Sequence, residues 1–195
     1  MRYPPGHREA TRTKILAGAV RKLRRKGLAG VGLSSAMRAA GLTVGGFYAH
    51  FRSKLALVDA VLRNGLEDGR ANWFAALGET TGVELEQNLV RRYLSRQHRD
   101  DVDHTCPMPT VVSSLPGGPA LLRATFTKHL NLCVDFIAER LNDTDAVERR
   151  QRALVILATC VGGMALARSV NDPALSDEIL RASRRALLSK ESSSR

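Results

Sequence analysis

Several features that would place this chain in other protein classes are scarce or missing in its 195 residues. No run of about eighteen apolar residues occurs, so the sequence predicts no membrane span, and its first residues lack the apolar segment of a signal peptide. The cysteines, Cys106, Cys133 and Cys160, are odd in number and far apart. This pattern argues against a disulfide framework and favours a reducing cytoplasm.

Acidic residues are almost absent from the first quarter of the chain. Residues 1–54 hold twelve Lys or Arg and a single acid, Glu9, and therefore carry the whole net charge of +11. The remaining 141 residues hold eighteen bases and eighteen acids. A basic head on a neutral body is typical of a polyanion-binding module joined to a second part.

Sequence patterns of enzyme active sites are also lacking. The chain contains no HExxH, no GxSxG, no P-loop and no GxGxxG that opens a helix. We therefore expect no enzyme and no cofactor. His98, Asp101, His104 and Cys106 are metal-ligand types without a recognised spacing, so we expect no metal site either.

Neither strand-like alternation nor an internal repeat is present, whereas apolar residues recur at the helical period along most of the chain. The sequence therefore predicts an all-α fold of about nine helices. The predicted segments are 8–26, 33–40, 44–50, 54–77, 83–97, 106–115, 120–141, 146–170 and 175–188.

Two short predicted helices, 33–40 and 44–50, are joined by a turn that starts at Gly41. This is helix-turn-helix geometry, in which the second helix can enter a major groove of DNA. The surrounding stretch, GLSSAMRAAGLTVGGFYAHFRSKLALV, resembles the DNA-binding signature of the TetR/AcrR family of transcriptional regulators. The resemblance covers residues 10–58. Its matching residues are Ala40-Gly41-Leu42, Phe47-Tyr48, His50-Phe51, Ser53-Lys54 and Leu57.

The resemblance implies a helix-turn-helix DNA-binding domain of three helices in residues 1–53. It implies a helical ligand-binding and dimerisation domain in residues 54–195. Such a protein is a bacterial, cytoplasmic and nucleoid-associated repressor without membrane contact. It binds an inverted-repeat operator in double-stranded DNA as a homodimer and is released by a small, largely apolar effector. An activator, a redox or electrophile sensor acting through Cys106, and an architectural DNA-binding protein without an effector remain alternatives.

The candidate DNA contacts follow from side-chain chemistry as well as from the resemblance. Thr43 offers a hydroxyl and a helix N-terminus to a phosphate, while Gly45 and Gly46 let the backbone approach DNA. The position of Val44 is often polar in relatives. With valine there, and with Gly45 and Gly46 beside it, we expect this helix to read few bases. Tyr48 as a packing residue and Lys54 as a solvated lysine are the structural alternatives. The predicted DNA-binding residues are Arg38, Thr43, Val44, Gly45, Gly46, Tyr48, His50 and Lys54.

Other basic residues of the head have a plainer interpretation. The run Arg24-Arg25-Lys26 is interpreted as the solvated end of the first helix, with a DNA contact as the alternative. Arg2 and Arg8 are interpreted as part of a disordered arm, with a basic arm that reaches a minor groove as the alternative.

The penultimate predicted helix, 146–170, is apolar almost all round, which predicts burial on both sides. The last two predicted helices resemble the dimerisation pair of the family, and two such pairs make a four-helix interface with twofold symmetry. The alternative is that both helices only complete the core of one chain. The predicted interface residues are Leu157, Val161, Gly162, Gly163, Met164, Ile179 and Ala186.

A ligand chamber is expected between these two ends, formed by apolar and aromatic side chains from several helices. In the family such a chamber binds a small molecule and shifts the helix that carries the DNA-binding head. The alternative is ordinary core packing. Gly65 and Gly69 mark either a bend in helix 54–77 or the close approach of another helix. The predicted lining residues are Trp73, Phe74, Leu77, Tyr93, Met108, Val112, Leu115, Phe126 and His129.

Overall fold

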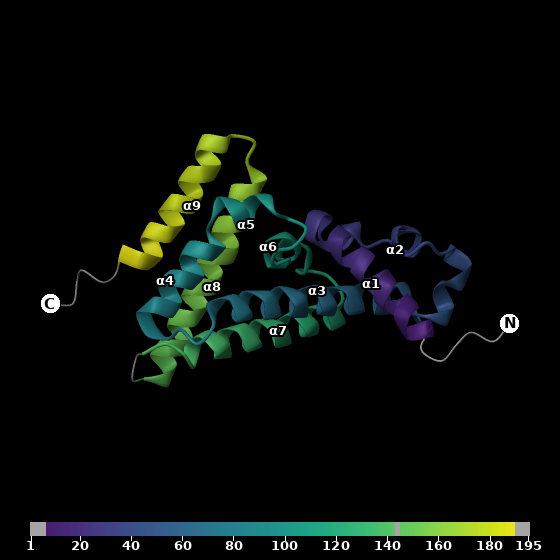
Figure 1. Cartoon of the computed structure of the whole chain (residues 1–195), viewed down its shortest axis with the longest axis horizontal. Helices are drawn as coiled ribbons and strands as arrows, with labels where there is room; N and C mark the ends of the chain where they lie inside the picture. The colour runs from purple at the N-terminus through teal and green to yellow at the C-terminus, as the bar shows by residue number, and fades with distance from the viewer. Residues whose placement is uncertain (1–6, 143–144, 190–195) are drawn as a thin grey trace. The chain divides into compact units, whose positions relative to one another are not determined.

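The computed structural model describes residues 7–142 and 145–189, and these residues form helices without any strand (Figure 1). The predicted all-α class is therefore confirmed. Arg2 of the expected arm lies outside the described residues, whereas Arg8, also expected there, lies in the first turn of a helix, α1. The elements are α1 (His7–Lys26), η1 (Leu28–Gly30), α2 (Leu33–Ala39), η2 (Val44–Ala49), α3 (Lys54–Leu77), α4 (Gly82–Tyr93), α5 (Arg96–Asp100), α6 (Met108–Val111), η3 (Val112–Ser114), α7 (Ala120–Ala138), α8 (Ala146–Ser169) and α9 (Pro173–Leu188).

The chain divides into two compact units. The first contains the residues up to Gly69 together with Cys106–His129, and the second contains Arg70–Thr105 and the residues from Leu130 onward. Helices α3 and α7 therefore each contribute residues to both units. The predicted division at residues 53 and 54 into a DNA-binding domain and a ligand-binding and dimerisation domain stays a prediction.

In the first unit, α1 and α2 pack closely because small residues meet between them. A Cβ atom on Gly18 would lie 2.6 Å from the Cβ of Ala39. The stripe of α1 that includes Ile15, Val20 and Leu23 is buried, as its helical spacing predicts. Helix α2 ends before Gly41, whose φ of +73° is favourable only for glycine, so this residue makes the turn of the helix-turn-helix.

The second short helix of the motif differs from its prediction. Residues Val44–Ala49 form a 3₁₀ helix rather than an α-helix ending at residue 50. Gly45 and Gly46 disfavour α-helix, and Thr43 precedes the helix without a capping hydrogen bond from its side chain. The segment is instead held by Phe47, which is fully buried.

Helix α3 has the predicted bounds. The Ser53 hydroxyl caps it by accepting a hydrogen bond from the Ala56 amide at 3.0 Å. Gly65 and Gly69 are sites of close approach, which resolves the alternative left by the sequence. A Cβ on Gly65 would lie 3.1 Å from the Leu23 side chain, and one on Gly69 would lie 3.2 Å from the Pro107 ring.

In the second unit, the predicted helix 83–97 is wrong at its end. Helix α4 stops at Tyr93, and the Ser95 hydroxyl caps the short helix α5 by accepting a hydrogen bond from the His98 amide at 3.1 Å. Helix α9 also begins earlier than predicted, because Asp172 caps it and Pro173 is favourable at its first position.

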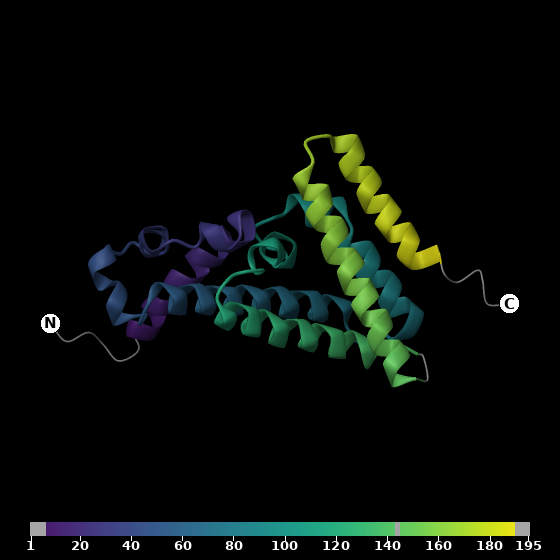
Figure 2. The same ribbon diagram turned by 180° about the vertical axis from the view of Figure 1, so that it is seen from behind.

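Helix α8 lies beside α4 and α9 in both views of the molecule (Figures 1 and 2). Gly163 permits this packing, since a Cβ there would lie 2.6 Å from the Ser183 hydroxyl and 3.2 Å from Leu94. Arg152 adds an ion pair with Glu86 and a hydrogen bond of 2.7 Å to the Leu187 carbonyl. These contacts hold α8 against α4 and α9.

Helix α8 is also the one helix of the described residues that is long and apolar enough to cross a membrane. The sequence predicted no such span. Length and composition are weak evidence here, because the core helix of a soluble protein meets the same criteria.

Candidate DNA-binding surface and ligand cavity

The residues predicted to bind DNA form an exposed rim around a buried aromatic centre. Thr43 and Lys54 are exposed, Val44 is 48% exposed and Tyr48 is 76% exposed, whereas the adjacent Phe47 is fully buried. Arg38, Gly45 and Gly46 are exposed as well. The packing alternative for Tyr48 is therefore disfavoured, and its hydroxyl is available to a partner.

Aromatic stacking fixes the position of this rim. The Phe47 and Phe51 rings stack with centroids 5.7 Å apart, and the Tyr48 ring meets Phe47 edge-on at 5.1 Å. Because Phe47 and Phe51 are buried, the residues between and beside them are held in register.

Arg12 of α1 contributes to this site, although no motif in the sequence singles it out. Its Nη1 atom donates a hydrogen bond to the His50 carbonyl at 2.7 Å, and its guanidinium lies 4.4 Å from the centre of the Phe51 ring. Arg12 therefore ties α1 to the chain that leaves η2. His50, predicted to contact phosphate, is half-buried with its Nδ1 atom shielded from solvent.

Gly45 and Gly46 are not required by the fold. Neither has a positive φ, and a Cβ on either would meet its nearest neighbour at 3.9 Å or more, which is ordinary contact distance. Gly41 differs, because its positive φ explains the glycine within the chain itself. Contacts among the described residues therefore do not require glycine at positions 45 and 46.

The run at the end of α1 differs in part from its prediction. Lys26 and Arg25 are exposed as expected, but Arg24 is only 8% exposed and lies 4.0 Å from an Asp68 carboxylate oxygen. Arg24 falls on the buried stripe of α1 that faces α3. The charge of the run favoured a solvated side chain at this position, so the prediction was wrong for Arg24.

Of the residues predicted to line a ligand chamber, four belong to the second unit. Trp73 is half-buried and lines a cavity. Tyr93 and Leu77 are buried. Phe74 stacks on Phe136 with ring centroids 3.6 Å apart, and this stacking accounts for it without a ligand.

The other five belong to the first unit. Met108, Leu115 and His129 are buried, Phe126 is half-buried and Val112 is 38% exposed. Their burial agrees equally well with core packing, so their place in a chamber stays a prediction.

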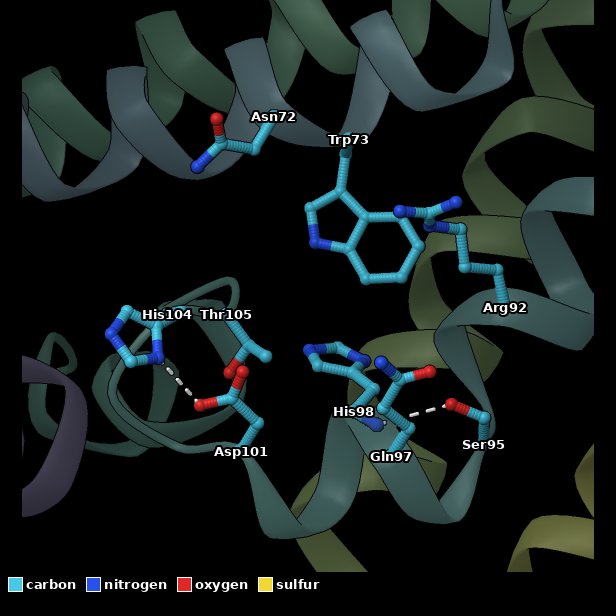
Figure 3. A pocket seen from close by; sticks show the side chains of 9 residues that line it. All are labelled: Asn72, Trp73, Arg92, Ser95, Gln97, His98, Asp101, His104 and Thr105. Atoms are coloured by element: carbon cyan, nitrogen blue, oxygen red, sulfur yellow. Dashed lines mark hydrogen bonds and ion pairs between the residues drawn. The ribbon is translucent and has the colours of Figure 1, made fainter.

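A cavity of about 370 Å³ lies wholly within the second unit (Figure 3). Trp73 is the one residue of the predicted chamber that lines it. The other lining side chains are polar or charged, in contrast to the largely apolar chamber that the sequence predicted for an effector. The lining residues are Asn72, Trp73, Arg92, Ser95, Gln97, His98, Asp101, His104 and Thr105.

His98 is the most unusual group in this cavity. It is only 3% exposed, and its ring packs 4.9 Å from the Trp73 ring and 4.4 Å from the Tyr93 ring. Its Nδ1 atom lies 2.6 Å from the Tyr93 carbonyl oxygen, so Nδ1 carries the proton. Its Nε2 atom is buried without a hydrogen-bond partner.

The protonation state of His98 follows from this environment. Burial lowers its pKa to about 4, against the opposing effect of the hydrogen bond to the Tyr93 carbonyl. The positive charge of Arg168 lowers the pKa further, whereas Asp101 raises it. At neutral pH the ring is therefore uncharged, and Nε2 is a hydrogen-bond acceptor.

Arg168 of α8 holds the wall of the cavity that contains His98. Its guanidinium donates hydrogen bonds to the His98 carbonyl, to the Arg99 carbonyl at 3.1 Å and to the Thr105 hydroxyl at 3.2 Å. These bonds satisfy carbonyl groups at the end of α5 that lack partners within the helix.

The predicted dimer residues fall into two groups. Leu157, Gly163 and Met164 are buried within the chain itself, as the core alternative proposed. Val161 and Ile179 are half-buried, and Gly162 and Ala186 are exposed. A separate apolar stripe runs along the open face of α8 at helical spacing. Its residues are Leu154, Val155, Ala158, Gly162 and Leu166.

All three cysteines are buried and none forms a disulfide. Cys106 is 5% exposed and precedes α6, which is only four residues long. Burial of this thiol gives no support to a sensor. Within residues 7–142 and 145–189, no group of three or more His, Cys, Asp or Glu is placed to hold a metal ion.

Comparison with known proteins agrees with the helix-turn-helix. Residues 15–61 match the model of bacterial regulatory proteins of the tetR family. No curated protein matches the chain.

Solved structures share its fold. A TetR transcriptional regulator from Chloroflexus aurantiacus is 22% identical, with a TM-score of 0.74 over 93% of this chain and 94% of that one. A TetR-family regulator from Cytophaga hutchinsonii is 18% identical, with a TM-score of 0.75 over 98% and 100%. The reduced form of NemR from E. coli is 20% identical, with a TM-score of 0.73 over 91% and 95%. Residues 15–61 therefore carry the helix-turn-helix signature of the tetR family, and the chain has the fold of solved TetR-family regulators.

Proposed function

We propose that this protein is a repressor that binds an inverted-repeat operator as a homodimer and leaves it when an effector binds. The observation that carries the DNA-binding part is the exposed rim of residues 43–48 on the buried Phe47–Phe51 stack, within the segment that holds the net charge of the chain. Such a rim presents backbone and hydroxyl groups to a polyanion at a fixed geometry.

Each residue of the rim has a defined role in this proposal. The Thr43 and Tyr48 hydroxyls and the Lys54 ammonium group bind phosphates, while Gly45 and Gly46 let the backbone come close to the DNA. Arg38 and His50 add further contacts to the DNA backbone, and Val44 meets a thymine methyl group. Most of these contacts recognise the DNA backbone, so sequence preference rests on few side chains.

Dimerisation is proposed through α8 and α9. Among residues 7–142 and 145–189, the open apolar stripe of α8 has no neighbour at Gly162, where a Cβ would meet nothing within 4 Å. A second copy of α8 can therefore approach closely at this position, and two heads related by a twofold axis require two related half-sites.

The effector is proposed to bind in the second unit and to act through α3. Trp73 of the cavity and Lys54 of the DNA-binding rim belong to this same helix. The effector must bind more tightly to the arrangement that cannot bind DNA, because equal affinity for both would shift nothing.

Genomic fragments retained by the purified protein test the proposal. We expect enrichment of one short inverted repeat, protected symmetrically in footprints, with a dimer in light scattering at micromolar concentration. Retention without sequence preference would instead support an architectural protein. A monomer that binds a single half-site would contradict the dimer.

A further inference from the structure

We propose that the cavity around His98 binds a flat, uncharged molecule through a hydroxyl group, with His98 Nε2 accepting the hydroxyl hydrogen and Trp73 packing against the ring. This inference rests on the proposed effector role and names the chemistry of the effector.

The buried ring of His98 offers a hydrogen-bond acceptor that no described residue uses. His98 Nε2 has no partner although the rest of the ring is fixed on both sides by Trp73 and Tyr93. A buried acceptor without a hydrogen bond destabilises the fold, so a group that donates to it gains more than it would in water. The Nδ1 atom is already used by the Tyr93 carbonyl, which leaves Nε2 no proton to donate. The ligand therefore has to supply the donor.

A donor and an acceptor of the protein face the cavity together. Figure 3 shows the indole nitrogen of Trp73 and the imidazole of His98 facing the same space. An indole N–H only donates and a neutral Nε2 only accepts. A hydroxyl group can bind both, because it donates one hydrogen bond to Nε2 and can accept another from the indole N–H.

The charge and shape of the cavity restrict the ligand further. The cavity contains one cationic side chain, Arg92, and one anionic side chain, Asp101. Asp101 is engaged by His104 at 2.8 Å, and the Arg92 guanidinium lies 5.6 Å from the centre of the Trp73 ring. With His98 neutral, the cavity has no net charge and favours an uncharged ligand. The Trp73 ring, half-buried beside Tyr93, provides an aromatic surface for a flat molecule.

The volume is sufficient for such a ligand. About 370 Å³ lies within the range of small-molecule sites in proteins. A ring system of one or two rings fits this space, whereas a long acyl chain does not match its polar lining.

Calorimetry with a matched pair of probes tests this assignment. The probes are 1-naphthol and 1-methoxynaphthalene, which share the ring system but differ in the ability to donate a hydrogen bond. We expect 1-naphthol to bind wild-type protein at least about tenfold more tightly, as one hydrogen bond to a buried acceptor provides. The anion 1-naphthoate should bind more weakly than 1-naphthol.

Two variants locate the effect. His98→Asn keeps an N–H near the Tyr93 carbonyl and removes the acceptor at Nε2, so the preference for 1-naphthol should vanish. His104→Asn is the matched control, since it makes the same change at an exposed histidine of the same cavity. It should keep the preference.

Several outcomes would overturn the inference. These are equal affinity of the two probes for wild-type protein, a preference that survives in His98→Asn, or no binding of either probe at millimolar concentration. If His98→Asn does not fold, ¹⁵N NMR of wild-type protein decides instead. We expect 1-naphthol to shift the Nε2 resonance of His98 and the methyl ether not to do so, and equal shifts would refute the assignment.

These measurements need no DNA, so their failure is distinct from failure of the proposed function. Binding of 1-naphthol through His98 without release of DNA would support the site and refute its effector role. Absence of binding in a protein that still recognises an inverted repeat would refute the site alone.

Discussion

The buried imidazole of His98 should make the stability of this protein depend on pH in a defined window. Burial lowers its pKa in the folded protein to about 4, whereas a histidine in the unfolded chain titrates near 6.5. Above pH 7 both states are neutral at this residue, and it contributes nothing to the pH dependence. As pH falls from 6.5 towards 4, the unfolded chain binds a proton that the folded chain does not, so the free energy of unfolding decreases.

The magnitude follows from the size of the shift. A difference of about 2.5 pKa units corresponds to about 3 kcal/mol, lost between pH 6.5 and 4. The groups that act on the ring are the Tyr93 carbonyl, Arg168 and Asp101.

Urea unfolding at a fixed protein concentration, repeated between pH 7.5 and pH 4, measures this contribution. The difference between wild-type protein and His98→Asn isolates residue 98, and His104→Asn should follow the wild-type profile because that side chain is exposed. The wild-type protein should lose about 3 kcal/mol more than His98→Asn over the window. Parallel profiles for these two proteins, or a wild-type protein that gains stability in acid, would refute the buried neutral imidazole.

Three other substitutions have defined outcomes. Gly163→Ala should lower the free energy of unfolding by about 2 kcal/mol, since its Cβ would lie 2.6 Å from an α9 side chain; an unchanged free energy of unfolding would contradict this packing. Arg12→Ala should cost about 2 kcal/mol through its hydrogen bond and its contact with the Phe51 ring, and an unchanged denaturation midpoint would exclude that role. Gly45→Ala combined with Gly46→Ala should leave stability unchanged or higher but weaken DNA binding at least about tenfold, whereas full retention of DNA would remove both glycines from the interface.

The sequence predicted the positions of the helices up to α3 to within a residue or two, because its signals there are local, although it did not predict that Val44–Ala49 is a 3₁₀ helix. Gly41 marks the turn, Ser53 marks the start of α3, and the apolar stripe of α1 gives its buried face. The family motif adds residues whose exposure the structure supports, such as Tyr48.

The ligand cavity was not predictable in the same way. A serine within a helical pattern gives only a weak signal, so the break at Ser95 and the inward turn of His98 were missed. Burial of a histidine in the polar stretch HRDDVDHT depends on contacts with Trp73 and Arg168 that are distant in sequence. Apolar composition also does not distinguish the buried face of a helix from an exposed one. Gly162 and Gly163 are adjacent in α8, yet a Cβ would meet nothing within 4 Å at Gly162 and the Ser183 hydroxyl at 2.6 Å at Gly163.

The salt dependence of DNA affinity tests the central claim, that residues 43–54 form the DNA-binding surface. Lys54→Ala and Lys128→Ala remove the same charge, the first at the start of α3 and the second on an exposed turn of α7. We expect Lys54→Ala to weaken binding to all operator variants alike. It should also lower the steepness of log affinity against log salt by about one, because one phosphate contact is lost. Lys128→Ala should change neither quantity. Identical slopes and affinities for the two variants would contradict the claim.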